Sequence, residues 1–198
     1  IPPVANLTTA NNSIFGSPNI TLSYNASDNN AVTQADLWIN GALNQTTTSV
    51  TNNAINSFAV QNMSEGRHNW TVNVSDVSGL LAIASVRYFT IDFTPPVINL
   101  SQPASGITIN SSTFPFNFTV TDNFDSVLGC NLTINSTVSD QNFNANNNTL
   151  TTRTISSLAD GFQVWNVTCS DDVANFNTSI TRNFTVLGAP TVSLVQPA

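Results

Sequence analysis

Hydrophobic and polar residues alternate along much of this 198-residue chain. In the segment 114–120, three Phe and one Val fall on one side of an extended backbone, and Pro, Asn and Thr fall on the other. The segments 70–74 and 165–169 alternate in the same way. Side chains of a strand point to opposite faces with a period of two, so each segment is predicted to be a half-buried β-strand. Helical spacing is not convincing anywhere, and β-branched residues between Asn-rich turns favour an all-β chain.

The pattern occurs twice. Residues 95–100 match residues 2–7 at an offset of 93, and "VWNVTCSD" at 164–171 matches "NWTVNVSD" at 69–76 at an offset of 95. An internal repeat of this length indicates tandem domains. Short strands at regular spacing, about seven per unit, predict that each unit is a β-sandwich of two sheets.

The repeat divides the chain into a first domain at 1–93, a second at 94–187 and a tail at 188–198. The tail resembles the leading strand of the second domain. We expect it either to begin a further tandem domain or to be donated to a sheet of the next subunit. In both cases Val192 and Leu194 should be buried against another unit, because a free strand exposes apolar side chains and unpaired backbone groups. The expected partners are therefore other copies or further units of the same protein.

The two cysteines are confined to the second unit. Cys130 aligns with Ala35 and Cys169 with Val74, so both are replaced together by small apolar residues in the first unit. This joint replacement favours an extracellular disulfide across the sandwich, joining opposite sheets and closing a loop of about 40 residues, worth ~3–4 kcal/mol. The alternative is two separate buried thiols, which are common core residues.

Charge is scarce. Charged residues make up 8% of the chain, there is no Lys, and four Arg leave a net charge of −7. A typical soluble domain has about 25% charged residues. No basic patch exists to neutralise phosphates, so we expect no nucleic-acid partner. No run of 18 apolar residues exists, so we expect no membrane span in this segment.

Asn, Ser and Thr supply the polar surface instead. The chain has 30 Asn, and 17 of them begin an Asn-x-Ser/Thr sequon. Some sequons arise by chance in strands, because positions i and i+2 share the outward face. The choice of Asn with no Lys is nevertheless what a sugar-coated surface permits, so we expect dense N-linked glycosylation. The expected sites are Asn6, Asn11, Asn19, Asn25, Asn44, Asn62, Asn69, Asn73, Asn99, Asn110, Asn117, Asn131, Asn135, Asn147, Asn166, Asn177 and Asn183.

Acidic loops are a weaker candidate site. In a sandwich of this type, Asp92, Asp122, Asp125, Asp171 and Asp172 would collect at one end. Carboxylates from several loops can hold Ca²⁺. The simpler interpretation, which we favour, is that Asp and Asn form tight turns there, so no metal or other cofactor is expected.

Candidate catalytic groups are few. The single His, His68, begins a strand and is expected to be an exposed structural residue; the single Glu, Glu65, lies beside a turn glycine. Neither is grouped with a nucleophile and an acid, so we expect no enzyme activity. Trp38 alternates against Leu37 and Ile39 and should point outward, where a carbohydrate, a neighbouring subunit or a glycan could cover it.

Each unit resembles the immunoglobulin-like (Ig-like) repeats of prokaryotic surface proteins. The shared motifs are a leading "TPPxV", an early "xDN", a mid-unit "ING" and a late "W-x-V-x-C-x-D-x-A-G-N"; the second unit carries them at 94–97, 122–123, 134–135 and 165–175. It departs from the pattern at Phe176, past the turn where Gly is frequent. The Asn-rich, Lys-free version is most similar to archaeal surface proteins. The resemblance implies a structural component of an extracellular, glycosylated cell-surface filament. The alternative is an adhesin stalk or a carbohydrate-binding spacer.

Overall fold

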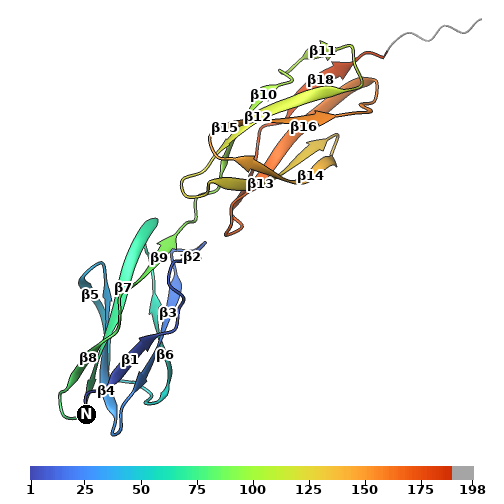
Figure 1. The fold of residues 1–198 in the computed structure, drawn as a ribbon. Coiled ribbons are helices and arrows are strands. Elements are labelled where there is room, and N and C mark those ends of the chain that lie inside the picture. Colours follow the sequence, from blue (N-terminus) through green and yellow to red (C-terminus); the bar gives the residue numbers. More distant parts are fainter. Residues whose placement is uncertain (189–198) are drawn as a thin grey trace, which may run out of the picture. The chain divides into compact units, whose positions relative to one another are not determined.

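The computed structural model describes residues 1–188, which fold into two units that divide between Phe93 and Thr94. The described residues form strands, turns and loops (Figure 1). Each unit has one three-stranded sheet and one six-stranded sheet. Val192 and Leu194, the predicted strand of a further unit, lie outside the described residues.

The first unit contains nine strands. The order β1-β3-β6 forms the small sheet; β2-β9-β7-β4-β5, with β8 also on β7, forms the large one. Neighbours pair antiparallel except β2 and β9, which run parallel. The strands are β1 (Val4–Leu7), β2 (Ser13–Phe15), β3 (Ile20–Ser27), β4 (Val32–Ile39), β5 (Ala42–Thr47), β6 (Ala54–Val60), β7 (Gly66–Asp76), β8 (Leu81–Ile83) and β9 (Arg87–Ile91).

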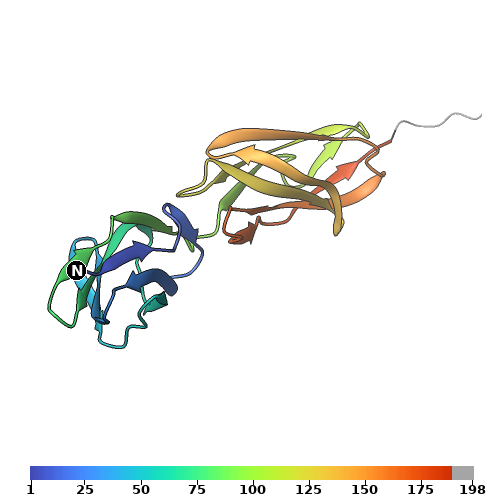
Figure 2. The ribbon, with the colours of Figure 1, turned by 60° about the horizontal axis from the view of Figure 1, so that its bottom comes forward.

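The second unit repeats this topology strand for strand. Figure 2 shows the strands of both units in a view turned by 60°. Its sheets are β10-β12-β15 and β11-β18-β16-β13-β14, with β17 on β16. Nine strands per unit replace the expected seven; β2, β8 and their equivalents have three residues each, too few for an alternating pattern. The strands are β10 (Val97–Gln102), β11 (Ile107–Ile109), β12 (Phe114–Thr121), β13 (Val127–Ile134), β14 (Thr137–Asn146), β15 (Thr149–Ile155), β16 (Gly161–Ser170), β17 (Phe176–Thr178) and β18 (Arg182–Val186).

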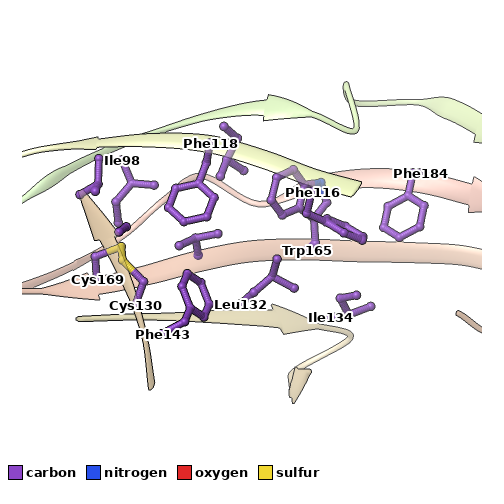
Figure 3. Close-up of a cluster of buried hydrophobic side chains, with 14 of the residues drawn as sticks. Ile98, Phe116, Phe118, Cys130, Leu132, Ile134, Phe143, Trp165, Cys169 and Phe184 are labelled. Atoms are coloured by element: carbon purple, nitrogen blue, oxygen red, sulfur yellow. A yellow bond between two sulfur atoms is a disulfide. The ribbon is translucent and has the colours of Figure 1, made fainter. Parts of the chain in front are cut away.

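The core of each unit lies between its two sheets and is built from the inward positions of the alternating strands. In the second unit, Phe116 and Phe118 of β12 face Leu132 and Trp165 of the large sheet (Figure 3). The ring centroids of Phe116 and Trp165 lie 5.0 Å apart in an edge-to-face arrangement, and both side chains are buried. Aromatic burial of this kind is a large part of what stabilises a sandwich.

The first unit has the same plan with different residues. Trp70 takes the place of Trp165, and Tyr24 stacks on Phe58 with centroids 5.4 Å apart. Burial raises the pKa of the Tyr24 phenol to about 12. Over residues 1–188 no helix has the length and hydropathy that crossing a membrane requires.

Candidate functional site

Cys130 and Cys169 form a disulfide, but it does not join opposite sheets as we expected. The two residues are directly paired on β13 and β16, neighbouring strands of the large sheet, with their Cα atoms 4.1 Å apart (Figure 3). Both side chains point into the core. Alternation shows that a residue faces inward but not which inward residue lies beside it, so an intersheet bridge and a cross-strand bridge look alike in the sequence.

The sequon Asn residues all keep some contact with solvent. Nine are exposed, eight are half-buried and none is in the core. The half-buried ones lie mainly on the outward faces of long strands, where neighbouring side chains cover part of the amide. The exposed ones are Asn6, Asn11, Asn19, Asn44, Asn62, Asn99, Asn110, Asn135 and Asn177; the half-buried ones are Asn25, Asn69, Asn73, Asn117, Asn131, Asn147, Asn166 and Asn183.

Asn147 already uses the nitrogen that a glycan would occupy. Its Nδ2 donates to the carbonyl oxygens of Asp122 at 2.8 Å and Asp125 at 2.6 Å, and its Oδ1 accepts from the Asp122 N–H at 3.0 Å. We call this set of side-chain hydrogen bonds to the loop backbone an amide clamp. Asn52 forms the equivalent amide clamp in the first unit, where it donates to Asp28 O and accepts from the Asp28 N–H. Asn52 does not begin a sequon. The clamp is therefore a property of the fold, and the sequon at Asn147 coincides with it.

Asn40 and Asn135 form a second pair of structural amides, in the "ING" region of each unit. Asn40 Oδ1 accepts from the Asn69 N–H at 3.1 Å, which fixes its Nδ2 as the donor to His68 Nδ1 at 2.9 Å. Asn135 does the same in the second unit: its Oδ1 accepts from the Val164 N–H, and its Nδ2 donates to Gln163 Oε1. Both Asn residues have positive φ, 52° and 47°, a conformation that Asn tolerates better than most residues.

His68 is buried, not exposed as we expected. Its Nε2 lies 2.9 Å from Ser64 O, an acceptor only, so Nε2 carries the proton and Nδ1 accepts from Asn40. The ring stacks on Phe89 with centroids 5.2 Å apart. The expectation was wrong because it did not extend the alternation of Trp70 and Val72 back to His68, which lies on the same inward face of β7. Its contacts give His68 a structural role, the one we had expected of it.

The acidic residues of the second unit do come together, on the loops after β12 and β16. Asp122 and Asp171 shape these loops: Asp122 Oδ1 accepts from Phe124 and Asp125 N–H groups, and Asp171 Oδ1 from two N–H groups of its own turn. The Asp172 N–H donates to Asp125 Oδ2 at 3.4 Å across the loops. This is the turn-forming role that we favoured.

The charges in this cluster repel. Partial burial, followed by the negative charges of Asp172, Asp122 and Asp171, raises the pKa of Asp125, while its hydrogen bond from the Asp172 N–H acts in the opposite direction. Asp122 Oδ2 is buried without a hydrogen-bond partner. Oxygen ligands for Ca²⁺ are therefore present, but most are already committed to the turns. Asp92, the fifth candidate, belongs to the first unit, where it is buried and its backbone N–H donates to Phe15 O at 3.0 Å.

A groove of about 270 Å³ lies on the outer face of the large sheet of the first unit. Trp38 points outward, as predicted: Leu37 and Ile39 beside it are buried, and Trp38 is half-buried. Its indole Nε1 is buried without a partner, so the ring lies against the sheet. The groove is lined by Trp38, Gly41, Asn69, Thr71, Asn73, Ile83 and Val86.

The arginines serve the fold. Arg87 donates to Thr9 O at 2.6 Å, and Arg182, the equivalent residue of the second unit, donates to Ser101 O at 3.0 Å. Arg87 therefore contacts the segment just after β1, whereas Arg182 contacts the last residues of β10. The other two Arg lie over aromatic rings of their own units, both at 4.5 Å from the ring centroid. The sequence shows that there are four arginines, but these contacts could not be predicted from it.

Residues 2–72 match the family model described as Bacterial Ig domain. The chain is similar in structure to fibronectin(III)-like modules of CbhA from Clostridium thermocellum, with 12% identity, a TM-score of 0.54, and 98% of this chain and 100% of that chain covered. Both units are Ig-like β-sandwiches. The family match lies within the first unit, and the second unit shares the topology of the first strand for strand.

A second similar structure comes from a 1.5-MDa bacterial ice-binding adhesin, with 19% identity and a TM-score of 0.51. The alignment covers 94% of this chain and 65% of that one. At these identities the likeness shows the fold alone. No match was found among curated proteins. The predicted all-β fold of two Ig-like sandwiches is confirmed, whereas the archaeal affiliation stays a prediction.

The structural amides Asn40 and Asn52, and the buried Gln163, were missed by the sequence reasoning. The internal repeat could have identified two of these residues, Asn40 and Asn52. Asn40 aligns with Asn135 and Asn52 with Asn147 at the offset of 95, and an Asn that recurs where only one copy is a sequon is retained for another reason. Gln163 aligns with His68, and only the geometry shows that an amide and an imidazole fill the same place.

Proposed function

We propose that this chain is a structural segment of an extracellular, N-glycosylated cell-surface filament built from tandem Ig-like repeats. The observation that carries the proposal is the distribution of polar groups over two equivalent sandwiches. Seventeen sequons keep contact with solvent while the cores between the sheets are apolar. Glycans are bulky and solubilising, so they can replace the charged side chains that most surfaces use.

The disulfide supports an extracellular location, because such bonds persist in oxidising compartments and are rare in the cytosol. Ig-like folds are typically structural, which agrees with a role as spacer or fibre. The proposed partners are other copies or further Ig-like units of the same protein, and the proposed additions are N-linked glycans without a metal cofactor.

Imaging and mass together test this proposal. Electron micrographs of the material purified from its cells should show long regular filaments, and the intact mass should exceed that of the polypeptide by several glycans. Short monodisperse rods would overturn the filament, and a mass equal to the bare chain would overturn the glycan coat.

A second candidate is an adhesin stalk or a carbohydrate-binding spacer. The outward Trp38 and the apolar groove around it favour this candidate, because aromatic side chains with polar neighbours suit sugar ligands. Binding of soluble oligosaccharides to protein made without glycans would support it, and a W38T variant that binds equally well would count against it.

A further inference from the structure

The groove on the first unit exposes apolar side chains to solvent. Ile83 is 64% exposed and Val86 53% exposed, and both border the half-buried Trp38. Exposed apolar groups that cluster in a groove mark a contact surface. The polar residues that line the groove are Asn69, Thr71 and Asn73, and both Asn residues begin sequons.

Asn73 is placed to carry a substituent over this groove. It is directly paired with Ile83 on β8, and it lies diagonally across from Trp38, whose direct partner on β7 is Thr71. Diagonal neighbours of this kind are about 7–8 Å apart, within reach of a large side chain. Asn73 Oδ1 is buried without a hydrogen-bond partner, so Nδ2 is the part of the amide that reaches solvent.

The second unit shows the same face with polar residues in the equivalent places. Thr133 stands where Trp38 does, and Thr178 where Ile83 does. Thr168, the equivalent of Asn73, makes a 2.8 Å hydrogen bond to Thr178 through their hydroxyl groups. On this face of the second unit, polar side chains therefore form a hydrogen bond with each other. In the first unit, Asn73 and Ile83 stand in the places of Thr168 and Thr178 and cannot form this bond, and Ile83 stays exposed beside the sequon at Asn73.

We propose that the N-glycan carried by Asn73 folds back onto Trp38, Ile83 and Val86, so that the groove is a docking site for the protein's own sugar. This inference rests on the glycosylated surface proposed above. A pyranose ring has an apolar C–H face that can lie on an indole or aliphatic surface, and hydroxyl groups that can face water. A glycan attached at the groove also has a high effective concentration there, which a free sugar or a second copy of the chain lacks.

The attachment itself needs an activated sugar donor, a lipid-linked sugar phosphate. The Asn73 Nδ2–C1 bond forms, the bond between C1 and the phosphate oxygen breaks, and the amide nitrogen loses one proton while the phosphate leaves. Asn73 keeps its second Nδ2 hydrogen. Asn73 Nδ2 has no hydrogen bond to lose within residues 1–188, in contrast to Asn147, whose Nδ2 donates twice.

Trp fluorescence provides a direct test on the glycosylated protein. The chain has three Trp, and Trp70 and Trp165 are 0% and 1% exposed, so acrylamide quenching reports Trp38. We expect Trp38 to be protected in the glycosylated protein and to become quenchable after enzymatic deglycosylation and in N73Q. In thermal unfolding, the effects of N73Q and W38T on the first unit should be non-additive by about 4 °C in Tm, and the coupling should vanish in protein made without glycans.

The second unit supplies the matched control. N166Q removes a sequon from the corresponding face, where Thr133 replaces Trp38, so N166Q should change neither Trp38 quenching nor the Tm of the first unit. Equal quenching with and without the glycan would overturn the proposal. So would protection that persists in N73Q, because it would identify another occupant.

Glycopeptide mapping separates the two proposals. If other sequons are occupied and Asn73 is bare, only the docking proposal fails. If every sequon is bare, the glycan coat of the proposed function fails with it.

Discussion

The two Ig-like units share one strand order but fill equivalent places with different chemistry. Where Ala35 faces Val74 on neighbouring strands of the first unit, the second has a disulfide. Where His68 accepts and donates one hydrogen bond each, Gln163 does so in the second unit. The comparison teaches that the backbone specifies the geometry of a position, while several residue types can satisfy it.

Removing the disulfide should have the largest effect. The double variant C130A/C169V gives the second unit the residues of the first, and should destabilise it by about 3 kcal/mol because the unfolded chain loses its cross-link. Calorimetry should show a lower Tm for the second unit and an unchanged one for the first. The reverse variant, A35C/V74C, should form a bond and stabilise the first unit, since these residues are directly paired. Equal unfolding of the second unit with and without the bond would contradict this.

The second-largest effect on stability is expected from removing the amide clamps. N147A should destabilise the second unit, and N52A the first, by about 2–3 kcal/mol, because each leaves two carbonyl oxygens and one N–H without their partner. Denaturant unfolding measures both effects. N146A, at an exposed neighbouring position, is the control and should stay within about 0.5 kcal/mol.

The same geometry predicts the glycan map. Asn147 should be unmodified in the mature protein, because both Nδ2 hydrogens are used by backbone carbonyls. Glycopeptide analysis that found a sugar there would show that the loop opens to accept it, and that the two clamps are not equivalent.

The sequence alone predicted the fold well because alternation is a local signal that survives in every long strand. The inward positions of β7, β12 and β16 were all visible in it. What it could not provide was pairing between strands. The cross-strand position of Cys130 and Cys169 depends on which strands become neighbours, and the period of two does not encode this. The burial of His68 could have been predicted, because His68 shares the inward face of β7 with Trp70.

Exchange of His68 and Gln163 tests whether these residues are interchangeable. H68Q should change the stability of the first unit by less than about 0.5 kcal/mol, since an amide can accept from Asn40 and donate to Ser64 O as the imidazole does. H68L removes both bonds and should cost about 1–2 kcal/mol. Urea midpoints distinguish the two. A cost for H68Q as large as for H68L would mean that stacking on Phe89, not hydrogen bonding, matters here.

The smallest expected effect concerns the acidic loops, where the second unit has four Asp and the first has Asp28 and Asp76 at equivalent places. Burial and neighbouring carboxylates raise the pKa of Asp125 in the folded state above its unfolded value. Between these two values the folded state binds more protons than the unfolded state, so the stability of the second unit should fall as pH rises through that window. D125N removes the charge and should stabilise the second unit at pH 7 by about 0.5 kcal/mol or less, because the site is largely solvated. The free energy of unfolding of the second unit, measured from pH 3 to 7, should depend less on pH in D125N than in the parent protein. Added salt should reduce the difference in stability between the two proteins, because it screens the repulsion. Parallel profiles would mean that the hydrogen bond from the Asp172 N–H, which favours the carboxylate, cancels the effects of burial and repulsion on the pKa of Asp125.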